Sequence, residues 1–178
     1  ANTPFILGET IAGEFPEVDK WVHTYNIGNI EIKKDDDFIS EPDMFCTESS
    51  FFDIFGVKIL QGSLSGFDQT NNKVLISREL SLKYFKNDNP VGRLLTLRYL
   101  GKEYPMEISA VYENFPQNST LKASIIAGID FGFHHLTANL VSTSNQKPDE
   151  KELKESWKNG LFFTNYLLLK KGTLSDEF

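Results

Sequence analysis

Apolar and polar residues nearly alternate over residues 15–32, the pattern of a β-strand with one buried face. The apolar members of this stretch are Val18, Trp21, Val22, Tyr25, Ile27, Ile30 and Ile32. Gly28 lies in the middle and predicts a turn or a β-bulge. The charged residues 33–37 predict a solvated turn, and a further strand is expected over residues 43–47.

A short helix is expected over residues 49–56, where two serines precede an aromatic run. The serines are predicted to cap this helix, and Gly56 is predicted to end it in the left-handed conformation. Three aromatic residues are spaced so that the helix presents them as one apolar stripe: Phe51, Phe52 and Phe55. Gly62 predicts a second chain reversal, after the apolar residues 57–60.

The middle of the chain predicts a strand, a helix and a hairpin. Residues 73–76 read as a short buried strand, and Ser77 is expected to cap a helix over residues 78–85. Pro90 and Gly92 bracket the turn into a hairpin. The hairpin itself is expected to consist of strands at residues 94–100 and 104–112.

The last third of the chain is less regular. Residues 123–129 predict a strand or a buried helical turn, and residues 131–141 predict a weak helix. A short helix is expected over residues 149–157, ended by Asn159-Gly160, and a strong strand over residues 162–170. Short strands, hairpins and isolated helices favour an α+β fold rather than a doubly wound sheet.

Composition narrows the classes of partner. The 178 residues contain 18 Lys and Arg against 25 Asp and Glu, a formal net charge of −7. An acidic chain without a dense basic patch argues against binding nucleic acid or adsorbing to anionic lipid. The 15 Phe residues favour several small cores or an interface, because each ring buries a large area.

Few residues offer catalytic or metal chemistry. The single cysteine, Cys46, reads as a small buried hydrophobe on a strand. His23 stands alone on an apolar strand and reads as a structural residue. His134 and His135 are adjacent, so they cannot readily share one metal ion, and a surface pair is expected. Asp35-Asp36-Asp37 lacks the ligand spacing of a calcium loop and reads as a turn.

Neither end of the sequence reads as a natural boundary. No apolar run reaches the roughly 20 residues that a membrane-spanning helix needs. At the C-terminal end, Ser175 and the acidic residues after it resemble the start of a helix. We therefore expect the chain to be a piece of a longer polypeptide.

Three stretches of the sequence form a pattern when taken together: residues 51–62 (FFDIFGVKILQG), residues 74–85 (VLISRELSLKYF) and residues 89–97 (NPVGRLLTL). This pattern resembles the MacB-like periplasmic core domain of MacB/FtsX-type ABC-transporter permeases. The order and spacing of the three stretches agree with that family. The residues that carry the resemblance shape turns and packing, and none is a candidate catalytic, cofactor-binding or metal-binding residue: Phe51, Phe52, Phe55, Gly56, Gly62, Ser77, Pro90 and Gly92.

The resemblance implies an architecture and a function. It implies a porter-like subdomain at residues 1–66, an inserted small α/β subdomain at residues 67–159, and a return segment at residues 160–178. It implies a non-catalytic periplasmic domain of an inner-membrane permease that couples ATP-driven motion to a periplasmic substrate or partner. ATP would be bound by a separate cytoplasmic ATPase subunit or domain, and no cofactor by this domain. The other partners would be a second permease copy and an adaptor or lipoprotein.

Two other classes of function are kept as alternatives. A periplasmic module that binds a peptide or a lipid would explain the excess of Phe through an apolar groove. An enzyme would need a pocket of titratable groups with shifted pKa values, built around His23, His134 or a carboxylate.

Overall fold

The computed structural model describes residues 2–144, 148–158 and 161–173 of the chain. Strands and helices follow one another there in the order α1 (Leu7–Glu14), β1 (Val18–Lys34), β2 (Asp37–Thr47), α2 (Ser50–Phe55), β3 (Ile59–Gly62), the 3-10 helix η1 (Phe67–Gln69), β4 (Lys73–Ser77), α3 (Arg78–Phe85), β5 (Leu94–Tyr99), β6 (Lys102–Tyr112), β7 (Ile125–Gly128), α4 (Ile129–Ser144), α5 (Glu150–Glu155) and β8 (Thr164–Leu169). This mixture is the α+β class that the sequence indicates. The expected helix end at Asn159-Gly160 and the expected cap at Ser175 lie outside the described residues.

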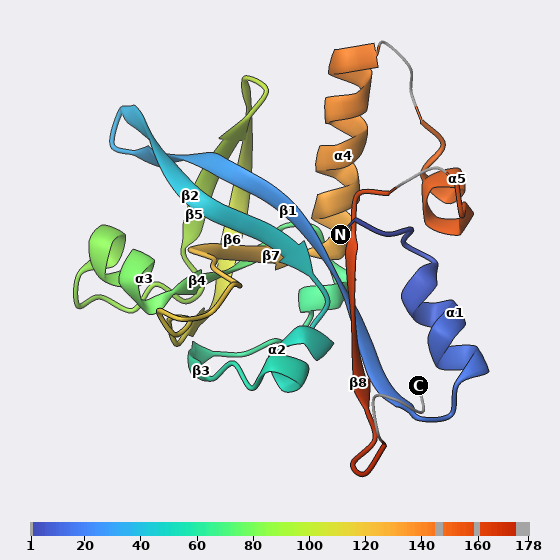
Figure 1. Ribbon diagram of the computed structural model, residues 1–178. Coiled ribbons are helices and arrows are strands. Elements are labelled where there is room, and N and C mark those ends of the chain that lie inside the picture. The colour runs from blue at the N-terminus through green and yellow to red at the C-terminus, as the bar shows by residue number, and fades with distance from the viewer. Residues whose placement is uncertain (1, 145–147, 159–160, 174–178) are drawn as a thin grey trace.

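The strands form one sheet, most of which closes on itself. β1 pairs with both β2 and β5, while β7, β4 and β6 connect β2 to β5 in that order. These six strands therefore have a partner on each side, which leaves few free edges for unwanted pairing. β8 extends the sheet from β1, and α1 lies beside this pair (Figure 1).

The sheet is buried on both of its faces near the centre. Successive side chains of a strand point to opposite faces. Val74 and Ile76 of β4 accordingly join a cluster with α3 and α4, whereas Leu75 joins a second cluster with α2 and η1. β7 divides its side chains in the same way. The continuous apolar runs of these two short strands follow from this double burial.

Several local predictions are confirmed. Gly28 forms a bulge in β1 rather than a turn, with register shifts on both sides and a φ of 79°. Gly56 ends α2 in the left-handed conformation with a φ of 63°. The side chain of Ser77 caps α3, and the β5–β6 hairpin turns at Leu100 and Gly101. The segment at residues 123–129 is a strand, β7, which then runs into α4.

Other predictions need correction. The serines before α2 do not cap it, because the Ser49 hydroxyl donates to Asp68 and the Ser50 hydroxyl donates to the Trp21 carbonyl oxygen. Helix α1 had no expected counterpart: its buried residue is Gly8, and the residue before it, Ile6, provides no side-chain cap that would mark its start. α4 continues to Ser144, beyond the predicted end at residue 141.

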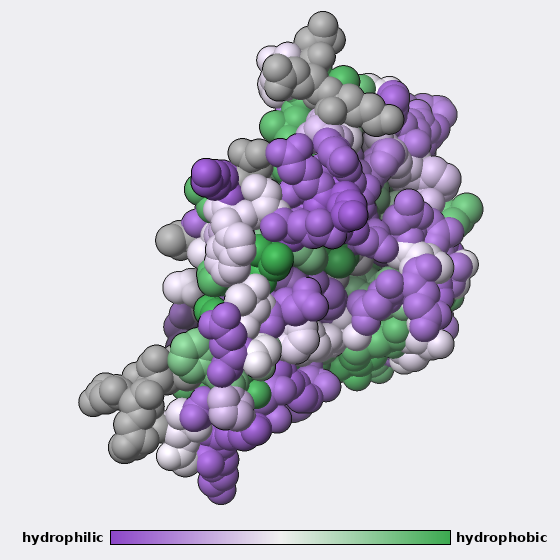
Figure 2. Space-filling view, turned by 90° about the vertical axis from the view of Figure 1, so that its right-hand side faces the viewer, coloured by the Kyte–Doolittle hydropathy of each residue, from purple (hydrophilic) through white to green (hydrophobic). Residues whose placement is uncertain are grey.

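The division into subdomains stays a prediction. Strands from both of the expected segments pair within the same sheet, for example β1 with β5 and β2 with β7. None of the described helices combines the length and hydrophobicity that crossing a membrane requires. The face over α1 and α5 is mostly hydrophilic, with hydrophobic side chains in limited areas (Figure 2).

Candidate functional site

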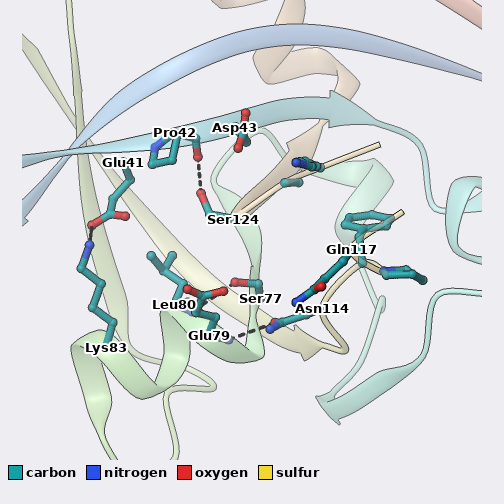
Figure 3. A pocket seen from close by; sticks show the side chains of 14 residues that line it. Glu41, Pro42, Asp43, Ser77, Glu79, Leu80, Lys83, Asn114, Gln117 and Ser124 are labelled. Carbon is teal, nitrogen blue, oxygen red and sulfur yellow. Dashed lines mark hydrogen bonds and ion pairs between the residues drawn. The ribbon is translucent and has the colours of Figure 1, made fainter. Parts of the chain in front are cut away.

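A cleft opens where two parallel strands of the sheet end. β4 and β6 run parallel, and their last residues, Ser77 and Tyr112, are register partners. The chain leaves β4 into α3 and leaves β6 into the loop at residues 113–124. Because diverging connections at the carboxyl ends of parallel strands leave a crevice, a ligand site is expected here. The cleft has a volume of about 550 Å³, and its walls are the start of α3, strand β2 and this loop (Figure 3).

The start of α3 forms the first wall. The Ser77 hydroxyl oxygen accepts a hydrogen bond from the Leu80 backbone N–H at 3.1 Å. The Asn114 side-chain oxygen accepts one from the Glu79 backbone N–H at 3.0 Å. Free N–H groups at a helix start attract anions. Two of these groups are already satisfied by side chains of the protein, so this wall offers little to an anionic ligand.

A buried carboxylate anchors the second wall, on β2. Glu41 is only 4% exposed, yet Oε1 accepts from Lys83 Nζ at 2.5 Å and from the Tyr84 hydroxyl at 2.6 Å. These charge-assisted bonds offset the cost of removing the carboxylate from water. Burial, together with the bond to Glu41, raises the pKa of Tyr84 well above its ordinary value. The two donors fix α3 against β2.

Asp43 continues the same wall in an unusual backbone conformation, with a φ of 61°. Its carbonyl oxygen accepts from the Ser124 backbone N–H at 2.8 Å. The Ser124 hydroxyl donates to the Pro42 carbonyl oxygen at 2.5 Å. These two bonds tie the end of the loop at residues 113–124 to β2, and the Asp43 side chain is left exposed at the cleft.

The loop at residues 113–124 forms the third wall and is closed at its base. The Tyr112 hydroxyl donates to the Ala123 carbonyl oxygen at 2.9 Å, so the two ends of the loop lie together. Phe115 packs edge-on against the rings of Phe51 and at an angle to Phe45. A compact loop of this kind, with its ends joined and its apolar residues packed inward, can hold a binding surface in place.

The chemistry of the cleft suits binding rather than catalysis. Neither a histidine nor the cysteine lines it, and the hydroxyl groups of Ser77 and Ser124 are both engaged with the backbone. A nucleophile paired with a general base is therefore not assembled there. Across residues 2–144, 148–158 and 161–173, no group of three or more His, Cys, Asp or Glu side chains could hold a metal ion.

Of the motif residues from the sequence, only Ser77 reaches the cleft. Phe51 and Phe52 are buried at 0% and 3% exposure, under the loop and beside η1. Gly62 is the last residue of β3 rather than a chain reversal, and at its φ of 77° an added Cβ would lie 2.1 Å from the Ser109 carbonyl oxygen. Four more motif residues shape other turns and packing without touching the cleft: Phe55, Gly56, Pro90 and Gly92. All eight motif residues remain predicted structural residues.

The sequence analysis missed the polar residues that line the cleft. Glu41, Asp43, Glu79 and Asn114 come from three separate segments, and nothing in the local pattern marks any one of them. Asn114 lies two residues after Tyr112, the last residue of β6, and a polar amide just beyond the carboxyl end of a strand was the one weak signal that could have pointed here.

The histidines lie away from the cleft. His23 is satisfied as a structural residue, since Nδ1 lies 2.6 Å from Glu48 Oε1 and Nε2 lies 2.8 Å from the Phe5 carbonyl oxygen. The prediction of a surface pair is confirmed for His134, which is exposed, and is wrong for His135, which is buried with 5% of its surface exposed. His135 faces the sheet from α4, where Nδ1 lies 3.0 Å from the Tyr25 hydroxyl. Cys46 is fully buried on β2, and burial raises the pKa of its thiol.

The closed sheet and the polar cleft at the ends of β4 and β6 define an α+β domain whose chemistry suits binding or a scaffold role. The sequence profile of one family matches residues 2–156, and the chain belongs to that family, the MacB-like periplasmic core domain. The chain is thus a periplasmic domain of a MacB/FtsX-like ABC-transporter permease, and such domains are non-catalytic. A comparison with curated proteins found no match.

Solved structures share the fold at low sequence identity. A domain described as part of a permease from Porphyromonas gingivalis has a TM-score of 0.75 at 21% identity, covering 98% of this chain and 72% of that one. The periplasmic region of MacB from Actinobacillus actinomycetemcomitans gives 0.52 at 15% identity, with 94% and 80% covered. The extracellular domain of the noncanonic ABC-type transporter YknZ from Gram-positive bacteria gives 0.54 at 12% identity, with 89% and 87% covered.

Proposed function

We propose that this domain couples ATP-driven movement of its permease to a periplasmic substrate or partner. The observation that carries the proposal is the way the N-terminal segment is bonded to the segment around β8, the strand that pairs with β1. Thr3 donates its backbone N–H to the Phe163 carbonyl oxygen at 2.7 Å, and Gly8 donates to the Asn165 side-chain oxygen at 3.0 Å. The Asn165 amide donates in turn to Thr3 Oγ1 and to the Pro4 carbonyl oxygen.

This arrangement supports transmission of force because β1 belongs to both the terminal pair and the closed ring. β8 pairs with β1 from Val18 to Thr24, and β1 then continues into its pairing with β2 and β5. A displacement of either terminal segment is delivered to one long strand, and the ring moves with that strand as a rigid body. The cleft between β2, α3 and the loop would move with it.

The proposal extends to the partners of the parent permease. A separate cytoplasmic ATPase would supply the movement, and a second permease copy would complete the transporter. A periplasmic adaptor or lipoprotein would receive the motion. The domain itself would bind no cofactor, and the isolated chain is expected to hydrolyse no ATP; turnover by the purified chain would contradict this.

The coupling is tested in the parent permease assembled with its ATPase. Asp36 lies in the exposed β1–β2 turn, so Asp36→Cys gives a spin-label site, while the buried Cys46 stays unlabelled. Pulsed electron resonance then measures the distance between the two copies with and without trapped ATP. We expect the distance to change when ATP is trapped.

Flexible insertions separate coupling from mere assembly. A Gly-Ser segment of about ten residues, placed both before Thr3 and after Gly172, is expected to abolish the ATP-dependent change while ATP hydrolysis continues. The same insertion between Leu100 and Gly101, at the tip of the β5–β6 hairpin, is the control and should preserve the change. An unchanged distance in the unmodified permease, or a change that survives the terminal insertions, would overturn the proposal.

A second candidate function, a binding module for a peptide or lipid, is favoured by one observation, the cleft of about 550 Å³. Its lining carries charged and amide side chains, which suits a peptide better than an acyl chain. Sequencing the parent reading frame separates the two functions, because a coupling domain requires membrane-spanning segments beside it and a free-standing module does not.

A further inference from the structure

The charges in the cleft are not balanced among themselves. Lys83 is neutralised by the buried Glu41. Asp43 and Glu79 form no ion pair with another described residue, and neither does Lys122 at the loop. The cleft therefore presents two exposed carboxylates against one free ammonium group, on walls that are otherwise fixed.

The two carboxylates belong to different walls. Asp43 is on β2 and Glu79 is in the first turn of α3, so each of these two walls of the cleft carries one carboxylate (Figure 3). Two backbone N–H groups at the start of α3 are already used within the protein, since Asn114 satisfies the Glu79 N–H and Ser77 satisfies the Leu80 N–H, which leaves Lys122 as the one unpaired cation against two carboxylates in the described lining. Charge complementarity thus favours a cation and disfavours a phosphate or a carboxylate.

Apolar and amide side chains complete the lining. Leu80 is 3% exposed, and Pro42, Phe115 and Pro116 add apolar surface around it, while Gln117 supplies a donor and acceptor at the loop. An apolar surface bordered by carboxylates matches a side chain with an aliphatic stem and a cationic head. Arginine fits best, because its planar guanidinium presents donors in a fixed fork that matches the geometry of a carboxylate.

The geometry points to this cleft as the docking site for an arginine or lysine side chain of a partner polypeptide. The occupant is a protein segment rather than a lipid or a free anion, because the site combines two carboxylates with a short apolar surface and no long apolar channel. The inference rests on the proposed function only in taking the partner to be a periplasmic protein. Binding to the cleft is measured on this chain alone, whereas coupling is measured in the assembled permease. Either proposal can therefore be contradicted while the other stands.

The test is a nuclear magnetic resonance titration of the ¹⁵N-labelled chain with N-acetyl-arginine methylamide. We expect the shifted amide signals to be those of Asp43, Glu79, Asn114 and Ser124. The matched ligand N-acetyl-citrulline methylamide keeps the shape but lacks the charge, and it should bind about tenfold more weakly. N-acetyl-leucyl-arginine methylamide should bind more tightly than the single residue, because it adds an apolar contact.

Variants locate the site. The double variant Asp43→Asn with Glu79→Gln should weaken arginine binding about tenfold, and Asn tolerates the positive φ at position 43. The control, Asp35→Asn with Asp36→Asn, makes the same change of net charge in the exposed β1–β2 turn and should leave binding unchanged. Equal binding of citrulline, stronger binding of inorganic phosphate, signals shifted elsewhere, or equal loss in both double variants would each overturn the inference.

Discussion

The imidazole of His23 stacks on the ring of Phe5, with centroids 3.8 Å apart, and its Nε2 lies 2.8 Å from the Phe5 carbonyl oxygen. The other ring nitrogen contacts Glu48, so one buried side chain joins the N-terminal segment, β1 and the segment after β2. The N-terminal segment is thereby held against the sheet by a polar contact as well as by the Asn165 amide.

The first prediction concerns this latch. His23→Leu should lower the free energy of unfolding by about 1–3 kcal/mol, because it removes the imidazole from Glu48 Oε1 and from the Phe5 carbonyl oxygen, while the backbone N–H of residue 23 still donates to Glu48 Oε2. Urea unfolding followed by circular dichroism measures the loss. His134→Leu is the control, since His134 is exposed, and should change stability by less than about 0.5 kcal/mol. Equal effects of the two substitutions would show that the latch carries no stability.

The ion pair at the cleft should be worth more than an exposed one. Lys83→Met removes a donor from Glu41, whose side chain is 6% exposed, and should cost about 1–3 kcal/mol. Lys20→Met is the matched control, because Lys20 pairs with Asp53 where the side chains are 42% and 71% exposed, and should cost less than about 1 kcal/mol. Thermal unfolding measures the stability of both variants. A smaller loss of stability for Lys83→Met than for Lys20→Met would contradict the role given to Glu41.

Gly62 should be intolerant of any side chain. Gly62→Ala combines a φ of 77° with a Cβ placed 2.1 Å from the Ser109 carbonyl oxygen, so it should destabilise the fold by more than about 1 kcal/mol. Gly13→Ala, in α1, meets nothing within 4 Å and should be neutral or stabilising. The melting temperatures of the two variants provide the comparison. A Gly62→Ala variant as stable as the parent would mean that β3 can move away from β6.

His135 should make stability depend on pH. Burial lowers its pKa from the ordinary 6.5 to about 4. In the unfolded chain the imidazole gains a proton as the pH falls below about 6.5, while in the folded chain it stays neutral until about pH 4. Protonation therefore favours the unfolded state, and stability should fall across this window and level off below it.

The measurement is urea unfolding at several pH values between 7 and 4, compared across variants. His135→Leu should lose less stability than the parent over this range, even though it also loses the contact with Tyr25. His134→Leu should reduce the slope only slightly, because burial is the larger cause of the low pKa of His135 and the charge of His134 the smaller one. Identical slopes for all three proteins would show that His135 titrates freely in the folded state.

The local signals in the sequence predicted most of the elements and their ends. Ser77 caps α3 and Gly56 ends α2 because cap and turn chemistry acts within a few residues. The alternation in residues 15–32 predicted β1, and the bulge at Gly28 follows from a residue that tolerates a positive φ. The family resemblance rested on the same kind of signal, since its motifs are turns, caps and an aromatic stripe.

The tertiary structure alone decided what those elements enclose. Nothing near Met44 indicates that it pairs with Ile125, and this long-range pairing of β2 with β7 helps to close the ring and brings Asp43 to Ser124. His135 looked like a surface residue because its neighbour is one, and only the packing of α4 against the sheet buries it. Local pattern reports which face of an element is apolar, whereas a cleft or a buried polar pair depends on which distant segment covers that face. The sequence by itself therefore determined the elements and the family, and the closure of the sheet determined the site.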